Sequence, residues 1–493
     1  MNGGISLESY LSTGDGYGME SQGNVDALNK ALSAGSLRGG AVEGSTSASG
    51  TPLKVESLEK TLKVITFTQK NIIFWKDQTV LPAYNTVEEY NKQISYGADT
   101  GGFIDEGELP EEYDGTYVRQ SQLVKYLGNT RVVTHPMTLV QNAHGNTMQM
   151  QQQAGTLWIL QRLEPALFTG NETLVPNEFN GLFTQQAKDF ATDIEWLDSD
   201  VVVDCRGKVL DEAFAETGSN AVTENYGFAT DLYATPRVLS DFVKTFYSRE
   251  RVSLPSSDGQ SVGMNVTRFK SNAGDIQLKP DVFLKYKPAK LNTSGATSSK
   301  ASATPTKDGT TPIAAVAATV TNSKWATADA GSYMWAVSSF NKYGESALEI
   351  LSTTPTAIVA SGAGALKFSI TDNSYPATGF RIYRSEKGAT YSAGNTKFYP
   401  LFDISAAQRT AGYHGGGASV VYDLNRWLPL TTKSLMIQRD VEVHSFKQLA
   451  PLMKMDLAVL SPAFRFMVLL YGTPMLYAPR KMVTFINVGT TFS

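Results

Sequence analysis

The spacing of apolar residues changes along the chain, and each spacing predicts a different element. Residues 137–172 repeat apolar side chains with the period of a helix, and their Gln and Met residues favour helix. This stripe consists of Leu139, Ala143, Leu157, Leu160, Leu163 and Leu167. About thirty helical residues would extend ~45 Å. Gly145, Gly155 and Pro165 can interrupt or bend such a helix.

Other stretches predict strands and one strand–helix junction. Residues 116–135 (TYVRQSQLVKYLGNTRVVTH) alternate apolar and polar positions, which predicts one long strand. An apolar strand near residue 230 ends at Thr235, a suitable helix N-cap, and Pro236 suits the first helical position. The apolar face of the helix that follows consists of Leu239, Phe242, Val243 and Phe246. Residues 275–286 predict another strand, whereas residues 56–76 fit helix and strand equally.

Changes in composition divide the chain into regions. Residues 1–55 are rich in Gly and Ser and predict a flexible arm. Residues 287–330 are of low complexity and predict a linker or an extended edge. Alternating aromatic and polar positions over residues 310–425 predict a small β-sandwich. Beyond residue 426 the earlier pattern returns, so the β-rich region is expected to be an insertion in a larger domain.

Length and charge narrow the classes of protein. A chain of 493 residues predicts two or three folded units. Its net charge of -4 argues against sequence-specific nucleic-acid binding, but it permits a wall that merely encloses nucleic acid. The single cysteine cannot form an internal disulfide. We see no signal peptide, and the most apolar stretch, residues 464–477, is too short for a membrane span. A soluble protein without membrane contact is expected.

The sequence contains no familiar catalytic, nucleotide-binding or zinc-binding motif. The scattered histidines have poor spacing for a shared metal; they are His135, His144, His414 and His444. Cys205 ends an apolar run and is interpreted as a buried core residue. We therefore expect no enzyme activity, no metal and no cofactor.

An acidic cluster over residues 105–114 needs its own interpretation. It consists of Asp105, Glu106, Glu108, Glu111, Glu112 and Asp114. Irregular spacing and Pro110 argue against a calcium loop, and so dense a run is typically solvated. We favour an exposed or intersubunit face, with a cation site and an acid/base pair as alternatives. Basic residues that could meet acids across an interface are Arg119, Lys125, Arg131, Arg249 and Arg251.

The order of segments resembles the major capsid proteins of tailed bacteriophages, whose HK97-type fold is shared with encapsulin shells. Residues 100–135 (TGGFIDEGELPEEYDGTYVRQSQLVKYLGNTRVVTH) look like the extended hairpin loop of that fold. The stretch LWILQRLEPALFTGNETLVPNEFNGLF looks like the end of its spine helix. YGFATDLYATPRVLSDFVKTFYSRERVSL is similar to the entrance of the axial domain, and residues 448–489 look like the closing strands. The strands YMWAVSSFNKYGES and FRIYRSE resemble fibronectin or immunoglobulin-like modules.

This resemblance implies an α+β, HK97-type capsid subunit with an inserted all-β, immunoglobulin-like sandwich. The implied regions are a flexible arm (1–55), the start of a peripheral domain (56–95), an extended hairpin loop (96–135), a peripheral domain with the spine helix (136–200), an axial domain (201–290), a linker with the inserted domain (291–425) and a return to the axial and peripheral domains (426–493).

The resemblance also implies a function and partners. Copies of the chain would form hexamers and pentamers of an icosahedral head, assembled in the host cytoplasm and retained in the virion. Portal, scaffold and decoration proteins would be partners, and double-stranded DNA would be enclosed without sequence-specific binding. The alternatives are an encapsulin-like shell and an adhesive surface protein led by the inserted domain.

Overall fold

The structure is a computed structural model that describes residues 66–98, 100, 102–140, 145–246, 266–284, 302–307, 313–315, 320–358, 364–369, 377–392, 396–414, 417–459 and 461–491. Helices and strands alternate irregularly in mixed sheets, so the α+β fold class predicted from the sequence is confirmed. In this part of the chain, no helix is long and apolar enough to cross a membrane.

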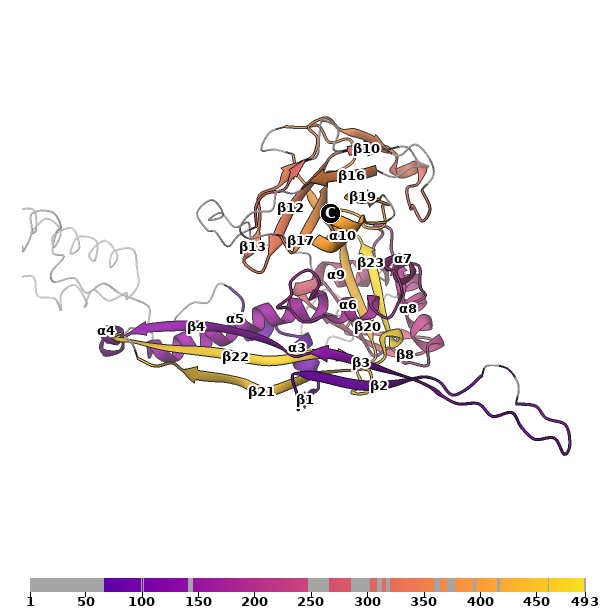
Figure 1. Cartoon of the computed structure of the whole chain (residues 1–493), viewed down its shortest axis with the longest axis horizontal. Coiled ribbons are helices and arrows are strands. Elements are labelled where there is room, and N and C mark those ends of the chain that lie inside the picture. The colour runs from indigo at the N-terminus through magenta and orange to yellow at the C-terminus, as the bar shows by residue number, and fades with distance from the viewer. Residues whose placement is uncertain are drawn as a thin grey trace, which may run out of the picture. The chain divides into compact units, whose positions relative to one another are not determined.

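A sheet of long strands, here called the long sheet, has the strand order β1-β21-β22-β4 (Figure 1). Its members are β1 (Val80–Pro82), β4 (Lys125–Thr134), β21 (His444–Asp456) and β22 (Ala463–Leu476). The last strands of the chain therefore pair with an early strand, because β22 runs antiparallel to β4 over most of its length. Long-range pairing of this kind is invisible in the local sequence pattern.

Helix α5 (Thr147–Thr169) covers one face of the long sheet and contacts β4 and β22 (Figure 1). Its buried side chains Ile159, Leu163 and Leu167 pack against Phe466, Val468 and Leu470 of β22 in one core. Gly155 permits close contact, because a Cβ there would lie only 3.1 Å from Val468 Cγ2. Gly155, which the sequence indicated as a possible helix break, instead lies inside α5 at its contact with the long sheet.

The predicted helix over residues 137–172 is shorter than its apolar stripe indicated. A separate turn of helix, α4 (His135–Leu139), precedes α5. Gly145 lies between them with φ +102°, a left-handed conformation that ends regular helix and favours glycine. Pro165 lies inside α5 without ending it.

The predicted single strand over residues 116–135 is in fact two strands in different sheets. β3 (Thr116–Leu123) pairs with β2 (Val87–Ser95) in a two-stranded hairpin, and β4 begins at Lys125 in the long sheet. Between them, the buried Val124 donates its N–H to the carbonyl of Thr86 at 2.9 Å. Continuous alternation in the sequence does not show this change of partner, because both strands have the same period. The described part of the ambiguous region, from residue 66 on, contains η3 (Gln69–Asn71) and the short helix α3 (Phe74–Asp77).

A second sheet has the order β5-β23-β20-β6-β8-β7 and its own apolar core. The strands are β5 (Val202–Asp204), β6 (Asp231–Ala234), β7 (Arg268–Ser271), β8 (Gly274–Pro280), β20 (Thr432–Ile437) and β23 (Met482–Val488). The associated helices are α6 (Leu182–Ala187), α7 (Asp193–Leu197), α8 (Glu212–Glu224), α9 (Pro236–Phe246), η4 (Val282–Leu284) and η6 (Pro479–Lys481). The predicted junction is confirmed, since Thr235 Oγ1 accepts from the N–H of Val238 at 3.5 Å and Pro236 begins α9.

The β-rich region, here called the insert, comprises the elements from β9 to β19 and precedes β20. Its elements are β9 (Thr306–Lys307), β10 (Ile313–Ala315), η5 (Thr327–Asp329), β11 (Gly331–Tyr333), β12 (Trp335–Asn341), β13 (Gly344–Glu345), β14 (Glu349–Ile350), β15 (Thr356–Ile358), β16 (Gly364–Ser369), β17 (Gly379–Arg384), β18 (Tyr399–Ser405), α10 (Ala406–Ala411) and β19 (Val420–Asp423). Among the described residues, these strands pair with one another and enclose a separate core around Trp335. An immunoglobulin-like identity for the insert stays a prediction.

Candidate intersubunit surface

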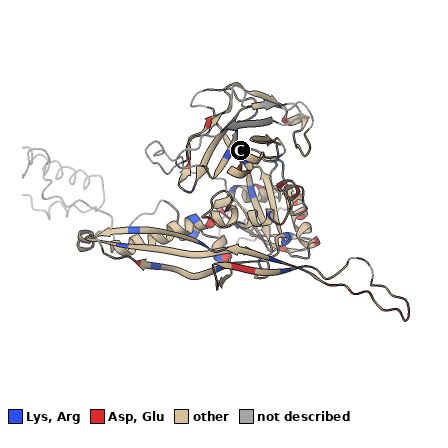
Figure 2. Ribbon diagram, in the orientation of Figure 1, with Lys and Arg blue, Asp and Glu red and all other residues tan. Residues whose placement is uncertain are grey.

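The acidic cluster lies at the tip of the β2–β3 hairpin, here called the hairpin tip (residues 96–115). All six clustered carboxylates are exposed to solvent. The sequence of the hairpin tip contains no Lys, Arg or His, so nothing within it neutralises this charge. Figure 2 marks these acidic positions at the far end of the hairpin. The surface is suited to long-range attraction of a basic partner.

The hairpin tip also exposes large apolar side chains between its carboxylates. Phe103 is completely exposed, and Leu109 is 87% exposed. A local turn displays them: the N–H of Glu108 donates to the carbonyl of Asp105 at 3.0 Å, and Gly107 has φ +91°. A two-stranded hairpin alone is only marginally stable in water. Exposed apolar residues rimmed by charge mark an interaction site.

The base of the hairpin, by contrast, is fastened to its own subunit. Tyr90 donates its hydroxyl to the carbonyl of Leu476 at 3.0 Å, and burial raises its pKa to about 12. The ammonium of Lys92 forms an ion pair with Asp189. The anchored base restricts where the exposed tip can point.

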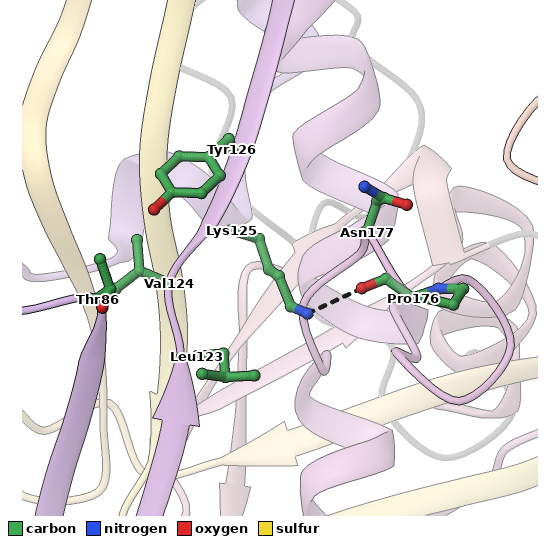
Figure 3. Close-up of a pocket in the computed structure, with 7 residues that line it drawn as sticks. All are labelled: Thr86, Leu123, Val124, Lys125, Tyr126, Pro176 and Asn177. Carbon is green, nitrogen blue, oxygen red and sulfur yellow. Dashed lines mark hydrogen bonds between the residues drawn. The ribbon is translucent and has the colours of Figure 1, made fainter.

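A cleft of ≈ 360 Å³ lies where the hairpin meets the loop after α5 (Figure 3). Across it, Lys125 Nζ donates to the carbonyl of Pro176 at 2.9 Å and lies 3.7 Å from Glu172. Four residues that line the cleft come from the junction between β3 and β4. They are Leu123, Val124, Lys125 and Tyr126. Lys125 therefore makes contacts within its own subunit.

The face of the long sheet that points away from α5, here called the open face, is apolar and partly exposed. Opposite residues in an antiparallel pair share a face. The register places Tyr126 opposite Tyr471 and Val132 opposite Arg465, on the side opposite the buried Phe466. Their neighbours on this face are Met453, Met455, Met467 and Leu469. Val132 remains 51% exposed and Met455 44% exposed.

The long sheet is also strongly basic. Its strands carry five basic residues and one acidic residue, which are Lys125, Arg131, Lys447, Lys454 and Arg465 against Asp456 (Figure 2). Lys447 follows the buried Phe446 and therefore lies on the open face. Within the described residues, no carboxylate pairs with Lys447 or Arg465. The strands of the long sheet therefore carry net positive charge, opposite in sign to the charge of the hairpin tip.

The other basic candidates have different environments. Arg119 lies on the hairpin and pairs weakly with Glu89 at 3.4 Å, with both side chains exposed. Arg131 is half-buried on the α5 side, and its Nε lacks a hydrogen-bond partner among the described residues. Arg249 and Arg251 lie outside the described residues. Sequence reasoning missed Lys447 and Arg465, because their shared face exists only after β21 and β22 pair.

Residues with potential chemistry are placed as follows. Cys205 is buried, as predicted, and burial raises the pKa of its thiol to about 12. His414 lies partly buried in the insert and His444 is buried at the start of β21, and burial lowers the pKa of each to about 4. In the part of the chain that the structure describes, no group of three or more His, Cys, Asp or Glu residues could hold a metal. His144 lies outside that part.

Comparison with known proteins finds similar sequences among phage major capsid proteins. The chain is 24% identical over 449 residues to the major capsid protein of Staphylococcus phage S25-3, which covers 88% of this chain and 90% of the relative. The major capsid protein of Staphylococcus phage K matches to the same extent. The chain is therefore similar to phage major capsid proteins along nearly the whole of both chains. A putative major capsid protein of Enterococcus phage phiEF24C is also 24% identical, over 452 residues, whereas no family profile matches.

Solved structures match most of the chain, each with a TM-score below 0.5. The capsid of a native GTA particle gives a TM-score of 0.43 at 8% identity and covers 90% of this chain and 99% of its own. A chain from the structure of Gordonia phage Cozz gives a TM-score of 0.41 at 9% identity, covering 91% of this chain and 96% of its own. The SrpI encapsulin of Synechococcus elongatus gives 0.40 at 9% identity, covering 89% and 94%.

Proposed function

We propose that this chain is the major capsid protein of a phage head and that its copies form hexamers and pentamers of an icosahedral shell. The observation that carries the proposal is similarity to phage major capsid proteins along nearly the whole of both chains. The separate core of the insert supports a surface domain added to a shell subunit. We assign the chain to the virion, where it encloses double-stranded DNA without reading its sequence.

The hairpin tip is our candidate for contact between neighbouring copies. Its exposed Phe103 and Leu109 need an apolar surface, and its carboxylates need basic residues. The open face of the long sheet offers both, through its methionines and tyrosines and through Lys447 and Arg465. We therefore pair the hairpin tip of one copy with the open face of another. A tip on an anchored base supports a defined direction of contact.

Microscopy of the expressed chain tests the shell proposal. Negative-stain images are collected from the full chain alone and from the chain expressed with a candidate scaffold protein. Closed shells, tubes or hexamers are the expected result. A monodisperse monomer under every condition would refute it. Because portal, scaffold and decoration proteins are proposed partners, co-purification with the particles is measured on the same samples.

A charge-exchange experiment tests the proposed contact separately. The double variant Glu111→Lys with Glu112→Lys is expected to lose assembly, because it places two cations against a basic sheet. Adding Lys447→Glu and Arg465→Glu should restore assembly. A matched control reverses Glu349 in the insert, which is expected to leave assembly unchanged. Failure of the four-fold variant to recover, with each variant still folded, would contradict the pairing while leaving the shell proposal intact.

A further inference from the structure

The outer side of β4 is a long strand edge, here called the β4 edge. β4 lies last in the order β1-β21-β22-β4, so one of its sides pairs with β22 and the other pairs with no strand among the described residues. Its 10 residues follow β22 in one continuous register without a bulge, and they include no proline. Bulges, prolines and short length are among the features that keep edge strands from pairing with other chains. β4 lacks these three features.

Hydrogen bonds at the two ends of β4 show which of its backbone groups point outward. In an antiparallel pair, alternate residues direct both N–H and C=O toward the partner strand, and the residues between them direct both away. The N–H of His135 donates to the carbonyl of Pro462 at 2.9 Å, which continues the register with β22. Odd-numbered residues of β4 therefore face β22. At the other end, the even-numbered Val124 directs its N–H to Thr86 of the hairpin instead. The outward residues of β4 are Tyr126, Gly128, Thr130, Val132 and Thr134.

These outward positions are open to another molecule. All of them are exposed, with Tyr126 60% and Val132 51% exposed. Among the described residues, no backbone hydrogen bond joins the β4 edge to a turn or loop. An exposed edge with free backbone donors and acceptors can bind an extended segment as an added strand.

The cleft beside Lys125 opens at the first end of the β4 edge (Figure 3). It is lined by Thr86, where the hairpin begins, and by Tyr126, the first outward residue of β4. Its volume of ≈ 360 Å³ lies within the range of ligand-binding clefts, about 300–1,000 Å³. The cleft can therefore receive a side chain of an added strand.

The charge of β4 favours an acidic strand. β4 contains Lys125 and Arg131 and no acidic residue. Lys125 already lies 3.7 Å from Glu172, whereas no carboxylate of the described residues forms an ion pair with Arg131. Arg131 Nε and Asn129 Oδ1 are also buried without a hydrogen-bond partner among those residues. A carboxylate on an added strand would supply the partner that Arg131 lacks.

The hairpin tip has the complementary composition. Among its described residues, the one backbone–backbone hydrogen bond closes the turn around Gly107, so residues 111–114 have free backbone donors and acceptors. Successive side chains of an extended segment point to opposite faces. Glu112 and Asp114 would therefore share one face, and Tyr113 would lie on the other.

The partner of the β4 edge must come from another copy of the chain. Residues 111–114 precede β3, which pairs with β2, and Val124 alone separates β3 from β4. β3 has 8 residues. At about 3.3 Å per residue, this paired stretch holds residues 111–114 roughly 26 Å from the start of the β4 edge of the same subunit. Reaching that edge within one subunit would require β2 and β3 to separate.

We propose that residues 111–114 of one copy add as an extended strand to the β4 edge of a second copy. Two carboxylates of the added strand would face Arg131 on the α5 side. Tyr113 would lie beside Tyr126 and Val132, which belong to the open face. This inference rests on the proposed contact between copies and adds main-chain pairing to it.

Hydrogen exchange of the full chain, measured residue by residue, tests the pairing. Assembled particles are compared with dissociated subunits, and the full chain is measured separately with an excess of a synthetic peptide of residues 103–116. Neighbouring outward N–H groups of β4, such as those of Gly128 and Thr130, should become at least tenfold more protected in both experiments. The N–H groups of Leu127 and Asn129, which face β22, should change little. In particles, residues 111–114 should gain protection as well.

A proline variant tests the backbone contact itself. Thr130→Pro removes one outward N–H and leaves the hydrogen bonds to β22 in place, and proline is tolerated on the solvent side of an edge strand. We expect it to fold, to assemble at least tenfold less and to lose the protection by the peptide. Thr130→Ala keeps the N–H and is the matched control, with assembly equal to that of the wild type. If T130P does not fold, the exchange of the wild type decides.

The outcomes separate this proposal from the shell proposal. Particles whose outward β4 amides exchange as fast as those of subunits, or a folded T130P that assembles like T130A, would overturn the edge pairing and leave the shell intact. Protection by the peptide without any particles would do the reverse. Particles that protect the β4 edge but not residues 111–114 would assign the edge to another segment and refute our choice of partner. Absence of both particles and peptide protection would refute both proposals.

Discussion

At the hairpin tip, Glu111 and Glu112 are exposed to water. Glu164, by contrast, is completely buried against residues 72–77, here called the plug segment, and accepts hydrogen bonds from three backbone N–H groups. Exposed carboxylates remain ionised at little cost, and they can attract a surface that is not yet bound. A buried carboxyl must be matched atom by atom, or it destabilises the fold. The same chemical group therefore serves association in one region and local structure in the other.

Apolar residues show the same difference. Phe103 at the hairpin tip is completely exposed and contributes no core contact, while Phe74 of the plug segment has no exposed surface. The plug segment completes its contacts within one chain. The exposed side chains described at the hairpin tip are those that we propose to contact another copy. Substitutions in the two regions should separate folding from assembly.

The largest effect on folding is expected from Phe74→Ala. Removing a fully buried ring between Phe168 and Tyr233 leaves a cavity and should lower the free energy of unfolding by about 3–5 kcal/mol. Urea denaturation of the isolated chain measures the change. Phe103→Ala is the matched control, and its denaturation midpoint should coincide with that of the wild type. Equal losses for the two variants would show that the hairpin tip is folded against its own subunit.

Glu164→Ala should have the next largest effect on the free energy of unfolding. It removes the acceptor for three buried N–H groups, and each group left unsatisfied costs about 1–3 kcal/mol unless water enters. A loss of about 3 kcal/mol is therefore expected in the same denaturation assay. The comparison variant is Glu111→Ala, for which no change in midpoint is expected. Equal midpoints for the two variants would show that Glu164 is not a structural acceptor.

A smaller, pH-dependent effect is expected from His444. Burial lowers its pKa to about 4, so the neutral imidazole favours the folded state above the ordinary histidine range, and stability is lost as pH falls from about 6.5 toward 4. The contribution should reach about 1–3 kcal/mol over that window. Unfolding curves of the wild type and His444→Asn at pH 7 and pH 4.5 measure it. Parallel losses in both proteins would assign the acid sensitivity to other groups.

The smallest effect on folding is expected at the hairpin tip itself. Glu111→Lys combined with Glu112→Lys should leave the unfolding midpoint unchanged and reduce assembly, with wild-type assembly weakening as salt rises because exposed charges are screened. Light scattering across a salt series follows assembly. A fall in monomer stability equal to the loss of assembly would remove the distinction between the two regions.

Local features of the sequence were enough to predict several elements. Thr235 and Pro236 marked the start of α9, and the aromatic alternation around Trp335 marked the β-rich insert with its own core. The irregular acidic run and Pro110 correctly indicated an exposed loop. These predictions succeeded because caps, turns and solvated charge depend on residues close together in the chain.

Other features could not be predicted from the sequence, because they depend on which strands pair with each other. The alternation over residues 116–135 is continuous, yet β3 pairs with β2 and β4 pairs with β22. Arg249 and Arg251, predicted as basic partners of the acidic tip, lie outside the described residues, whereas the shared face of Arg465 and Lys447 comes from two late strands. Glu164 gave no signal within an apolar helix, since its role depends on residues 73–75.

The sequence by itself indicated a helix in the stretch that became α5, an exposed acidic loop and a β-rich region, because each depends on spacing and solvation along a short stretch of chain. Only the tertiary structure decided which strands share a sheet, which face of the long sheet stays open and which carboxyl is buried. Those properties arise when segments far apart in the chain exclude water together. The pairing of β22 with β4 is one such contact.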